Sequence, residues 1–199
     1  MFTGIIENIG IVLNVETHGS NKTFTLRSAI ANELKVDQSL AHNGICLTVE
    51  SIENDTYRVT AIEETLQKTN AAAWVDGNRI NLERCMQMNG RLDGHLVQGH
   101  VDGTAICVAR NEKDGSTEFT FQFDEKFSHL IVEKGSITVN GISLTCYNVG
   151  KNSFSVAIIP YTIEHTNIGD VYISCIVNLE FDIIGKYVQR SATLQSQSK

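Results

Sequence analysis

The chain has 199 residues, of which 42% are hydrophobic and 20% are charged, a composition typical of a folded protein rather than a disordered one. Its net charge of −7, with no run of Lys or Arg, argues against non-specific binding to nucleic acid or to an anionic membrane. No stretch approaches the roughly 18 apolar residues of a transmembrane helix, and the start MFTGII lacks a basic signal-peptide region, so a cytoplasmic protein is predicted.

The first 84 residues predict short strands. Near the N-terminus Ile9, Ile11, Leu13 and Val15 alternate with other residues, which predicts a half-buried strand within residues 1–15. Further strands are predicted at 24–28, on both sides of the Asn-Gly pair at 43–44, at 57–62 and at 79–84, with a short helix at 64–68. Six short strands with one short helix favour a small closed barrel over a sandwich of long strands.

The second half of the chain repeats the first. Shifted by 97 residues, residues 43–70 align without a gap on residues 140–167, with ten of 28 positions identical. The same shift aligns INLE at 80–83 with VNLE at 177–180, which makes thirteen identities in 41 positions. A long period that occurs only twice predicts two copies of one small domain and not a solenoid.

The second copy begins at about residue 94, after a polar linker at 85–93. Gly99 aligns with Gly4 at an offset of 95, and a strand at 119–123, a short helix at 127–132 and a hairpin at 136–149 are predicted. Pro160, the single proline, stands where the first copy has Glu63. Because proline fixes φ and has no N–H, we expect this loop to differ in shape between the copies.

A helix is predicted after Asp182, with Ile184, Tyr187, Val188, Ser191 and Leu194 on one face and Asp182 as its cap. It has no counterpart in the first copy, so we expect its apolar stripe to lie at a subunit interface. The predicted fold is all-β, with two tandem six-stranded Greek-key-like barrels related by duplication (1–92 and 93–182) and a C-terminal helix and tail (183–199).

The five cysteines, at positions 46, 85, 107, 146 and 175, are odd in number and widely spaced, which favours reduced thiols. None has the spacing of a zinc site, so no metal is predicted. Cys46 faces Ser143 in the alignment, and it is either a small buried apolar residue or a reactive thiol. His95 and His100 are each interpreted as structural histidines. The residues alone predict a double barrel that binds a small molecule between like halves.

The motifs MFTGII, AHNGICLTV, EETL, INLER, DGHLVQGHVDGTA, KGSITVNGISLT, IPYT and VNLEFD, in this order from Met1 to about Val188, resemble those of riboflavin synthases of the duplicated-barrel type. The resemblance implies a dismutation in which two molecules of 6,7-dimethyl-8-ribityllumazine exchange a four-carbon unit to give riboflavin and 5-amino-6-ribitylaminouracil, without metal or redox cofactor. It also implies a homotrimer with sites between subunits, C-terminal helices as trimer contacts, and an association with lumazine synthase.

The resemblance also implies site residues. The polar candidates for proton transfer or nucleophile assistance are Ser39, Cys46, His100 and Asp182. The first pocket would be lined by Cys46, Leu47, Thr48, Thr60, Ala61, Ile62, Glu63, Glu64, Thr65, Gly99, His100 and Val101. The second would be lined by Gly4, Ile5, Ile6, Lys134, Ile142, Ser143, Leu144, Thr145, Val156, Ala157, Ile158, Ile159, Pro160, Tyr161 and Thr162. Asp93 departs from the family, since it replaces one glycine of a usual pair before His95.

Two other interpretations compete with the enzyme. Lumazine-binding fluorescent antenna proteins share the duplicated barrel and bind the ligand without converting it, but their cysteine and histidine motifs are degraded. Here Cys46, the GHLVQGH segment and Asp182 are intact, which favours the enzyme. A flavin-reductase barrel is a third alternative, and its flavin and nicotinamide signatures are not visible.

Overall fold

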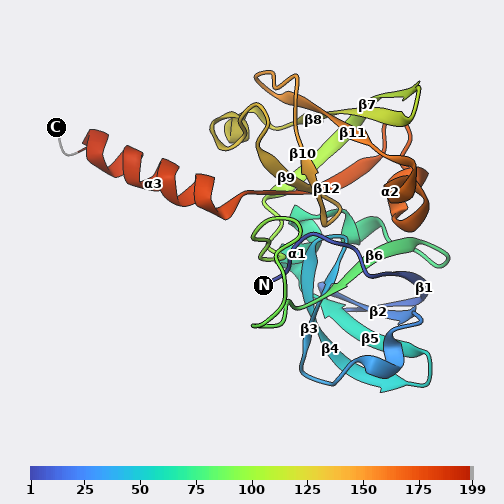
Figure 1. Cartoon of the computed structure of the whole chain (residues 1–199). Coiled ribbons are helices and arrows are strands. Elements are labelled where there is room, and N and C mark those ends of the chain that lie inside the picture. Colours follow the sequence, from blue (N-terminus) through green and yellow to red (C-terminus); the bar gives the residue numbers. More distant parts are fainter. Residues whose placement is uncertain (198–199) are drawn as a thin grey trace.

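The computed structural model describes residues 1–197, which form two β-units, one stacked on the other, and a long C-terminal helix (Figure 1). In the first unit β1 (Asn8–His18), β2 (Asn21–Arg27), β3 (Ser39–His42), β4 (Ile45–Glu53), β5 (Thr56–Ala61) and β6 (Arg79–Arg84) close a barrel in the order β1-β2-β5-β4-β3-β6. This order is a Greek key. The connections hold η1 (Ala31–Glu33), α1 (Glu63–Lys68) and η2 (Asn70–Ala73).

The second unit repeats this order with one interruption. Its strands are β7 (Gly103–Lys113), β8 (Ser116–Phe123), β9 (Ser136–Val139), β10 (Ile142–Thr145), β11 (Ser153–Ile158) and β12 (Ile176–Phe181), with η3 (Glu125–Leu130), α2 (Pro160–His165) and η4 (Asn167–Asp170) between them. The sheet order is β10-β9-β12-β7-β8-β11, and an isolated bridge links Tyr147, two residues after edge strand β10, to Ser155 of the other edge strand, β11. β10 is shorter than β4 because the chain turns at Asn148, which has a left-handed φ of 50°.

The predicted Asn-Gly hairpin turns lie at the contact between the units. Asn43 and Gly44 have φ values of 48° and 78°, and Asn140 and Gly141 have 47° and 79°, as the two-residue turn with two left-handed residues requires. A Cβ atom on Gly44 would lie 2.9 Å from the backbone N of Gly141. The two turns therefore pack back to back, and neither glycine could carry a side chain there.

Six asparagines join the units around these turns: Asn43, Asn70, Asn81, Asn140, Asn167 and Asn178. The side-chain amide of Asn81 donates to the Asn140 carbonyl at 2.9 Å, and that of Asn178 donates to the Asn43 carbonyl at 2.9 Å. The backbone N–H groups of Asn70 and Asn167 donate across the contact to the side chains of Asn178 and Asn81, both at 2.7 Å. Each asparagine has its counterpart 97 residues away, so the units face each other with approximate twofold symmetry.

Each unit has its own hydrophobic core. In the first, Trp74 packs on Phe24 with 5.1 Å between ring centroids, and in the second, Phe119, Phe121 and Phe154 pack together. The cores differ at one polar pair: fully buried His42 lies 3.0 Å from the Tyr57 hydroxyl and 3.0 Å from the Leu40 carbonyl. At the matching places the second copy has Val139 and Phe154.

This buried pair predicts acid sensitivity of the first unit. Burial lowers the pKa of His42 from its ordinary 6.5 to about 4, so the unfolded chain binds more protons between these pH values and stability falls as pH drops. From pH 7.5 to 4.5 the loss from this residue is roughly 2 to 3 kcal/mol. We expect the double variant His42→Val/Tyr57→Phe, which copies the second unit, to lack this part of the loss in denaturant titrations at the two pH values. His18→Gln, at an exposed histidine, is the control, and a pH dependence unchanged in the double variant would contradict the assignment.

Three sequence predictions need correction. The residues of β1 in the barrel core are Gly10 and Val12, whereas Ile9, Ile11 and Leu13 are only half-buried. A bulge between Val12 and Asn14 then shifts the register, so that Val15 and not Asn14 packs against the core. The strand begins at Asn8, and residues 1–7 cross toward the other unit.

The loop at Pro160 is the third correction. The residue before helix α1 has φ −78° and ψ 165°, and the residue before α2 has −73° and 155°, so the two loops have the same shape. Pro160 is the first residue of α2, where a helix needs no N–H and favours the φ of proline.

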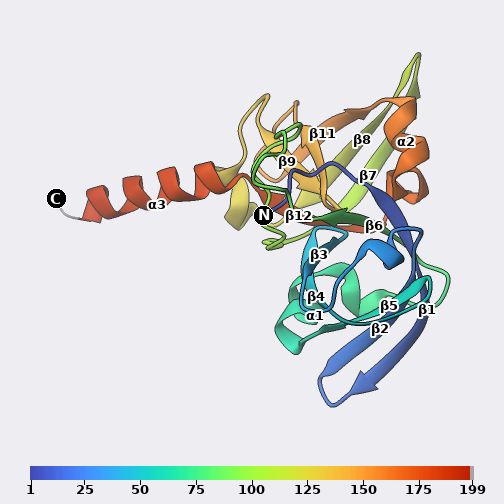
Figure 2. The same ribbon diagram turned by 60° about the horizontal axis from the view of Figure 1, so that its bottom comes forward.

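The C-terminal helix and the free cysteines are confirmed. Helix α3 (Ile183–Gln197) begins directly after Asp182, whose Oδ1 accepts a hydrogen bond from the Ile184 N–H at 2.9 Å. It contacts η3 near its first turn and then extends away from both units (Figure 2). All five cysteines are free thiols. The boundaries proposed at residues 92 and 182 stay a prediction.

Candidate functional site

The first residues of each copy cross to the barrel of the other copy. The Ser143 N–H donates to the Gly4 carbonyl and the Cys46 N–H donates to the Gly99 carbonyl, both at 2.8 Å. We call residues 2–6 strap 1 and residues 95–101 strap 2. The straps pair with each other through the bridge between Phe2 and Val97. Each strap therefore forms a wall beside the strand that follows the Asn-Gly turn of the opposite unit.

Only glycine fits where the straps touch these strands. Gly4 and Gly99 both have φ of 79°, in the left-handed region that residues with a Cβ atom rarely adopt. A Cβ atom would lie 2.6 Å from Cβ of Ser143 at Gly4, and 2.7 Å from Cβ of Cys46 at Gly99. The two glycines occupy equivalent places, as their alignment at an offset of 95 predicts.

Two buried glutamates hold the straps. The Glu83 carboxylate accepts hydrogen bonds from the N–H of Thr3 at 2.6 Å and of Gly4 at 2.9 Å. The Glu180 carboxylate accepts them from Gln98 at 2.7 Å and from Gly99 and His100, both at 2.9 Å. Burial raises the pKa of both carboxyls, and the N–H donors oppose that rise. These are the glutamates of the repeated INLE and VNLE motifs.

The first pocket lies between strap 2 and the first barrel. It is a cavity of about 230 Å³ lined by Ile45, Cys46, Glu64, Thr65, Lys68, Thr69, Gly99, His100 and Val101. Helix α1 supplies its outer rim, where Lys68 forms an ion pair with Glu64 at 2.6 Å. Strap 2 supplies the exposed imidazole of His100 opposite β4.

Cys46 is a protonated thiol in this pocket. It is partly buried, and this burial raises the pKa of the thiol, whereas a hydrogen bond with the Ser39 side chain opposes the rise. A thiolate, the strong nucleophile, would require a positive neighbour or a helix N-terminus. At neutral pH Cys46 can therefore pack against a ligand or donate a hydrogen bond, and it needs a base before it can attack one.

The second pocket lies between strap 1 and the second unit. A cavity of about 620 Å³ is lined by residues 4–9, Ile142, Ser143, Leu144, Tyr161, Thr162 and residues 164–166. A further cavity of about 480 Å³ shares Ser143 and Leu144 and adds Lys134, Thr145, Tyr147 and Ala157. In the first of these two cavities, the exposed ring of the lining residue Tyr161 stacks on His165 with centroids 4.0 Å apart.

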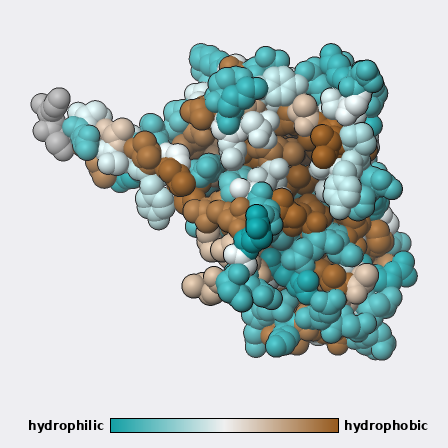
Figure 3. All heavy atoms as spheres, viewed as in Figure 1, coloured by the Kyte–Doolittle hydropathy of each residue, from teal (hydrophilic) through white to brown (hydrophobic). Residues whose placement is uncertain are grey.

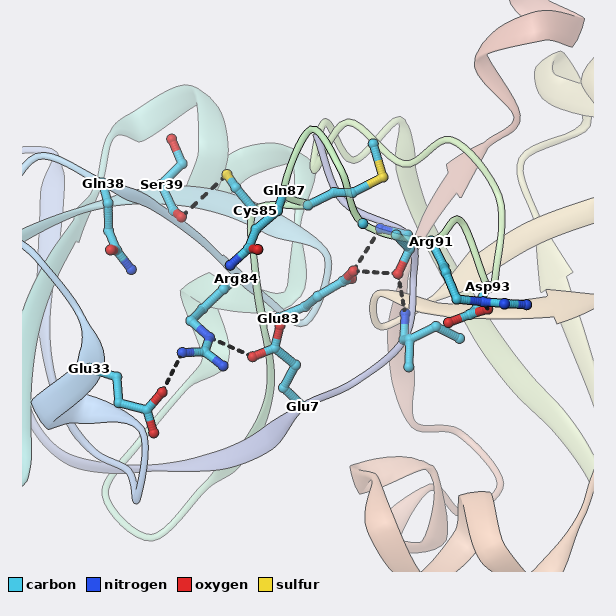
Figure 4. Close-up of a pocket in the computed structure, with 14 residues that line it drawn as sticks. Glu7, Glu33, Gln38, Ser39, Glu83, Arg84, Cys85, Gln87, Arg91 and Asp93 are labelled. Carbon is cyan, nitrogen blue, oxygen red and sulfur yellow. Dashed lines mark hydrogen bonds and ion pairs between the residues drawn. The ribbon is translucent and has the colours of Figure 1, made fainter.

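A third cavity, of about 500 Å³, lies beside strap 1 and the linker (Figure 4). Arg84 lies at its base and binds Glu7 through Nε and Glu33 through Nη1, both at 2.6 Å. The Cys85 thiol points to the Ser39 carbonyl at 3.5 Å. The single positive charge of Arg84 thus bridges the two carboxylates of Glu7 and Glu33. Ser39 lines this third cavity, and its side chain hydrogen-bonds to Cys46 of the first pocket.

Many of the predicted site residues line the first two pockets. Those at the first pocket are Cys46, Glu64, Thr65, Gly99, His100 and Val101. Those at the second pocket and its extension are Gly4, Ile5, Ile6, Lys134, Ile142, Ser143, Leu144, Thr145, Ala157, Tyr161 and Thr162.

The remaining predicted residues lie elsewhere. The side chains of Leu47, Ala61, Val156 and Ile158 are buried in the barrel cores, so only their backbone could reach a ligand. Thr60 binds Thr23 through its hydroxyl. Thr48, Ile62, Glu63, Ile159 and Pro160 are exposed and line neither pocket, although Glu63 and Pro160 adjoin the lining residues Glu64 and Tyr161. Ser39 lines the third cavity, and Asp182 caps α3.

Sequence reasoning missed two groups that shape the pockets. Glu83 and Glu180 were visible only as identical letters of the repeat, and His95 was interpreted as a structural histidine. His95 lies against Ser143, with Nδ1 2.7 Å from the hydroxyl oxygen. Within residues 1–197, no three His, Cys, Asp or Glu side chains are grouped as metal ligands would be, and no helix is long and apolar enough to span a bilayer.

Comparison with known proteins gives concordant matches. The family model described as "Lumazine binding domain" matches twice, at residues 3–85 and 98–182. The chain is 39% identical over 191 residues to the riboflavin synthase of Actinobacillus pleuropneumoniae, covering 96% of this chain and 89% of that protein. It is 37% identical over 200 residues to the riboflavin synthase of Bacillus subtilis strain 168, covering 100% of this chain and 93% of that protein.

Solved structures share the fold. The crystal structure of LumP complexed with riboflavin superposes with a TM-score of 0.85 at 21% identity, covering 91% of this chain and 99% of that one. The crystal structure of LumP complexed with 6,7-dimethyl-8-(1'-D-ribityl) lumazine superposes with a TM-score of 0.83 at 20% identity, covering 90% and 98%. These likenesses establish two stacked β-units of the same topology.

Proposed function

This chain belongs to the riboflavin synthase family of lumazine-binding proteins, and from that premise we propose that it converts two molecules of 6,7-dimethyl-8-ribityllumazine into riboflavin and 5-amino-6-ribitylaminouracil by transfer of a four-carbon unit. The two relatives named riboflavin synthase match this chain over 89% and 93% of their own length, which supports the proposed activity.

The observation that carries this proposal is a pair of unlike pockets built on one frame. Both have the strand after an Asn-Gly turn as one wall and a strap from the other copy as the opposite wall. One presents Cys46 and His100, and the other presents Ser143 and Tyr161. A reaction that uses one compound twice, as donor and as acceptor, needs two such related but different sites.

The chemistry needs orientation and proton transfer. One lumazine must lose a proton from its C7 methyl group, and C7 of the other must receive a nucleophile. Holding the two rings face to face removes most of the entropic cost of a bimolecular step. Cys46, Ser39 and His100 are the protonatable or hydrogen-bonding groups that we propose for the first pocket, and Ser143 for the second. Asp182, which lines neither pocket and caps α3, is the remaining candidate. We propose that no metal or redox cofactor takes part.

The proposal extends to assembly. Helix α3 carries exposed apolar side chains at Ile184, Tyr187 and Val188 and extends from the body of the chain, which supports a role in joining subunits. We propose a homotrimer in which the first pocket of one subunit faces the second pocket of the next. A cytoplasmic location and association with a lumazine synthase, which would supply the substrate, are further parts of this proposal.

The test is whether the pure protein converts the proposed substrate. Incubation with 6,7-dimethyl-8-ribityllumazine should yield riboflavin, followed by its absorbance, with two lumazines consumed for each riboflavin formed. A non-catalytic antenna protein would change the fluorescence of the lumazine and form no riboflavin. Binding without product over many hours would refute the enzymatic proposal and support that alternative.

The variant Cys46→Ser separates chemistry from binding. We expect turnover to fall at least about tenfold while lumazine affinity stays near that of the parent, because Ser143 at the matching place demonstrates that a hydroxyl fits this frame, but a hydroxyl lacks the acidity and nucleophilicity of a thiol. Turnover and fluorescence titration measure the two effects. Cys85→Ser, at a neighbouring exposed thiol, is the control. Parental turnover in Cys46→Ser would mean that Cys46 serves only in packing.

A further inference from the structure

A buried histidine, His95, lies behind the wall of the second pocket and contacts Ser143, which lines that pocket. Nδ1 of His95 lies 2.7 Å from Oγ of Ser143, a short hydrogen bond. Ser143 lines both cavities of the second pocket, whereas the His95 side chain is buried with 8% of the residue exposed. The hydroxyl is therefore the part of this pair that a ligand can touch.

The backbone holds His95 in place. Its N–H donates to the Thr3 carbonyl at 3.0 Å, which ties strap 2 to strap 1. At the preceding residue, Gly94, a Cβ atom would lie 2.0 Å from the Thr3 carbonyl oxygen and 2.9 Å from Cβ of Ser143. The chain thus passes so close to the strand of Ser143 that the imidazole has little room to shift.

The Ser143 hydroxyl is the hydrogen-bond partner of this imidazole. Among the described residues, no protein group bonds to Nε2 of His95, although that atom is buried. Burial disfavours protonation of the ring and lowers the pKa of His95, while the negative charge of Asp182 opposes this shift. In either neutral tautomer Nδ1 occupies one hydrogen-bonding direction of the hydroxyl and so determines which direction remains for a ligand.

The first pocket differs at the matching place. Among residues 1–197, no histidine hydrogen-bonds to Cys46 as His95 does to Ser143. Cys46, which occupies the place of Ser143, instead has the Ser39 side chain as its neighbour. The two pockets therefore differ in the group that orients the residue on the shared wall, and not only in that residue itself.

We propose that His95 is a positioning residue of the second pocket, which orients the Ser143 hydroxyl toward a polar atom of the bound heterocycle. This inference rests on the proposed function for the identity of that ligand, a ribityllumazine or riboflavin. The ligand sits against Ser143, and His95 acts on it only through the hydroxyl. A purely structural histidine would stabilise strap 2 whether or not Ser143 carried a hydroxyl.

A double-mutant cycle tests this dependence. Riboflavin formation is measured for the parent, His95→Gln, Ser143→Ala and the double variant. We expect His95→Gln to lower kcat/KM about tenfold, since it leaves the pocket hydroxyl unoriented. In the Ser143→Ala background the same change should cost less than about twofold, because no hydroxyl remains to be oriented. A tenfold loss in both backgrounds, or in neither, would overturn the proposal.

Substitution of His95 by Asn gives an independent readout. The Asn side chain places a hydrogen-bonding atom near the position of Nδ1, whereas Gln places one near the position of Nε2. Asn should keep activity within about threefold of the parent, and Gln should not. Equal losses for the two would contradict an action through Nδ1. Thermal denaturation identifies any variant that fails to fold, and His18→Gln at the exposed end of β1 is the matched control.

Failure of this inference is distinguishable from failure of the proposed function. If the parent forms no riboflavin, the proposed function is refuted, and the same cycle is then measured as riboflavin affinity by quenching of the ligand's fluorescence. Loss of affinity in His95→Gln that disappears in the Ser143→Ala background would still support the positioning role. Affinity equal in all four proteins would refute it.

Discussion

Removal of residues 183–199 is expected to lower riboflavin formation at least about a hundredfold and to leave monomers. The first turn of α3 contacts η3, but the rest extends from the body of the chain with apolar residues along its length (Figure 3). Exposed apolar side chains in such an arrangement indicate a protein interface. If donor and acceptor pockets come from different subunits, loss of the contact separates them, and misplacement of reacting groups by even about 1 Å can cost a hundredfold.

Sedimentation together with the riboflavin assay measures both parts of this prediction. A point variant guards against unfolding of the shortened chain: Tyr187→Glu places a charge at an exposed aromatic residue of α3. Gln189→Glu, on the opposite side of the helix by its spacing of about 100° per residue, adds the same charge and should leave assembly intact. A shortened chain that sediments as a trimer, or a fully active monomer, would contradict the role of α3.

The second large effect is expected at the glycine of strap 2. Gly99→Ala adds a Cβ atom 2.7 Å from Cβ of Cys46 in addition to the strain of an alanine at φ 79°. The backbone strain alone costs about 1 to 2 kcal/mol. Because the overlap involves a Cβ atom and the nearby backbone N of Cys46, and not the end of a flexible side chain, the strap must move. We expect a lower melting temperature and a loss of lumazine binding at the first pocket.

Gly115→Ala provides the matched control. Gly115 has φ of 83°, and a Cβ atom there would meet no atom within 4 Å, so this variant carries the strain without the overlap. Thermal denaturation and lumazine titration of both variants isolate the contact with Cys46. Gly4→Ala should produce the corresponding defect at the second pocket, where the Cβ atom would lie 2.6 Å from Cβ of Ser143. Equal behaviour of Gly99→Ala and Gly115→Ala would mean that the strap does not press on the pocket.

The repeat in the sequence identified the positions that the two copies share, but it did not show which contacts these residues make. The Asn-Gly turns, the asparagines after α1 and α2, and the glutamates of INLE and VNLE were recognisable as shared letters. In the structure they hold one copy against the other, as when the Asn167 side-chain amide donates to Asn43 Oδ1 at 2.8 Å, across 124 residues of sequence. No local pattern predicts such a contact, since both partners are ordinary turn or strand residues within their own copy.

The candidate site illustrates the same limit. Cys46 and Ser143 could be compared from the alignment alone, and the loops that contain Glu64 and Tyr161 could be placed beside them. His95 could not, because it reaches Ser143 only after strap 2 has crossed to the other unit. The prediction for Pro160 was wrong for a local reason. Proline disfavours the interior of a helix but is favoured at its first residue, and the exact start of a short helix cannot be read from the sequence.

The amino-acid sequence by itself determined the duplication, the short strands, the left-handed Asn-Gly turns and the added helix, because these depend on interactions between residues close in the chain or on backbone preferences. The tertiary structure decided which face of β1 enters the core and how the straps exchange. It also decided which side chains share a pocket. The first of these depends on strand pairing and a bulge within the first barrel. The others depend on contacts between residues roughly 40 to 140 apart and on the absence of room for a Cβ atom at Gly4 and Gly99, which arise only when the two units are packed together.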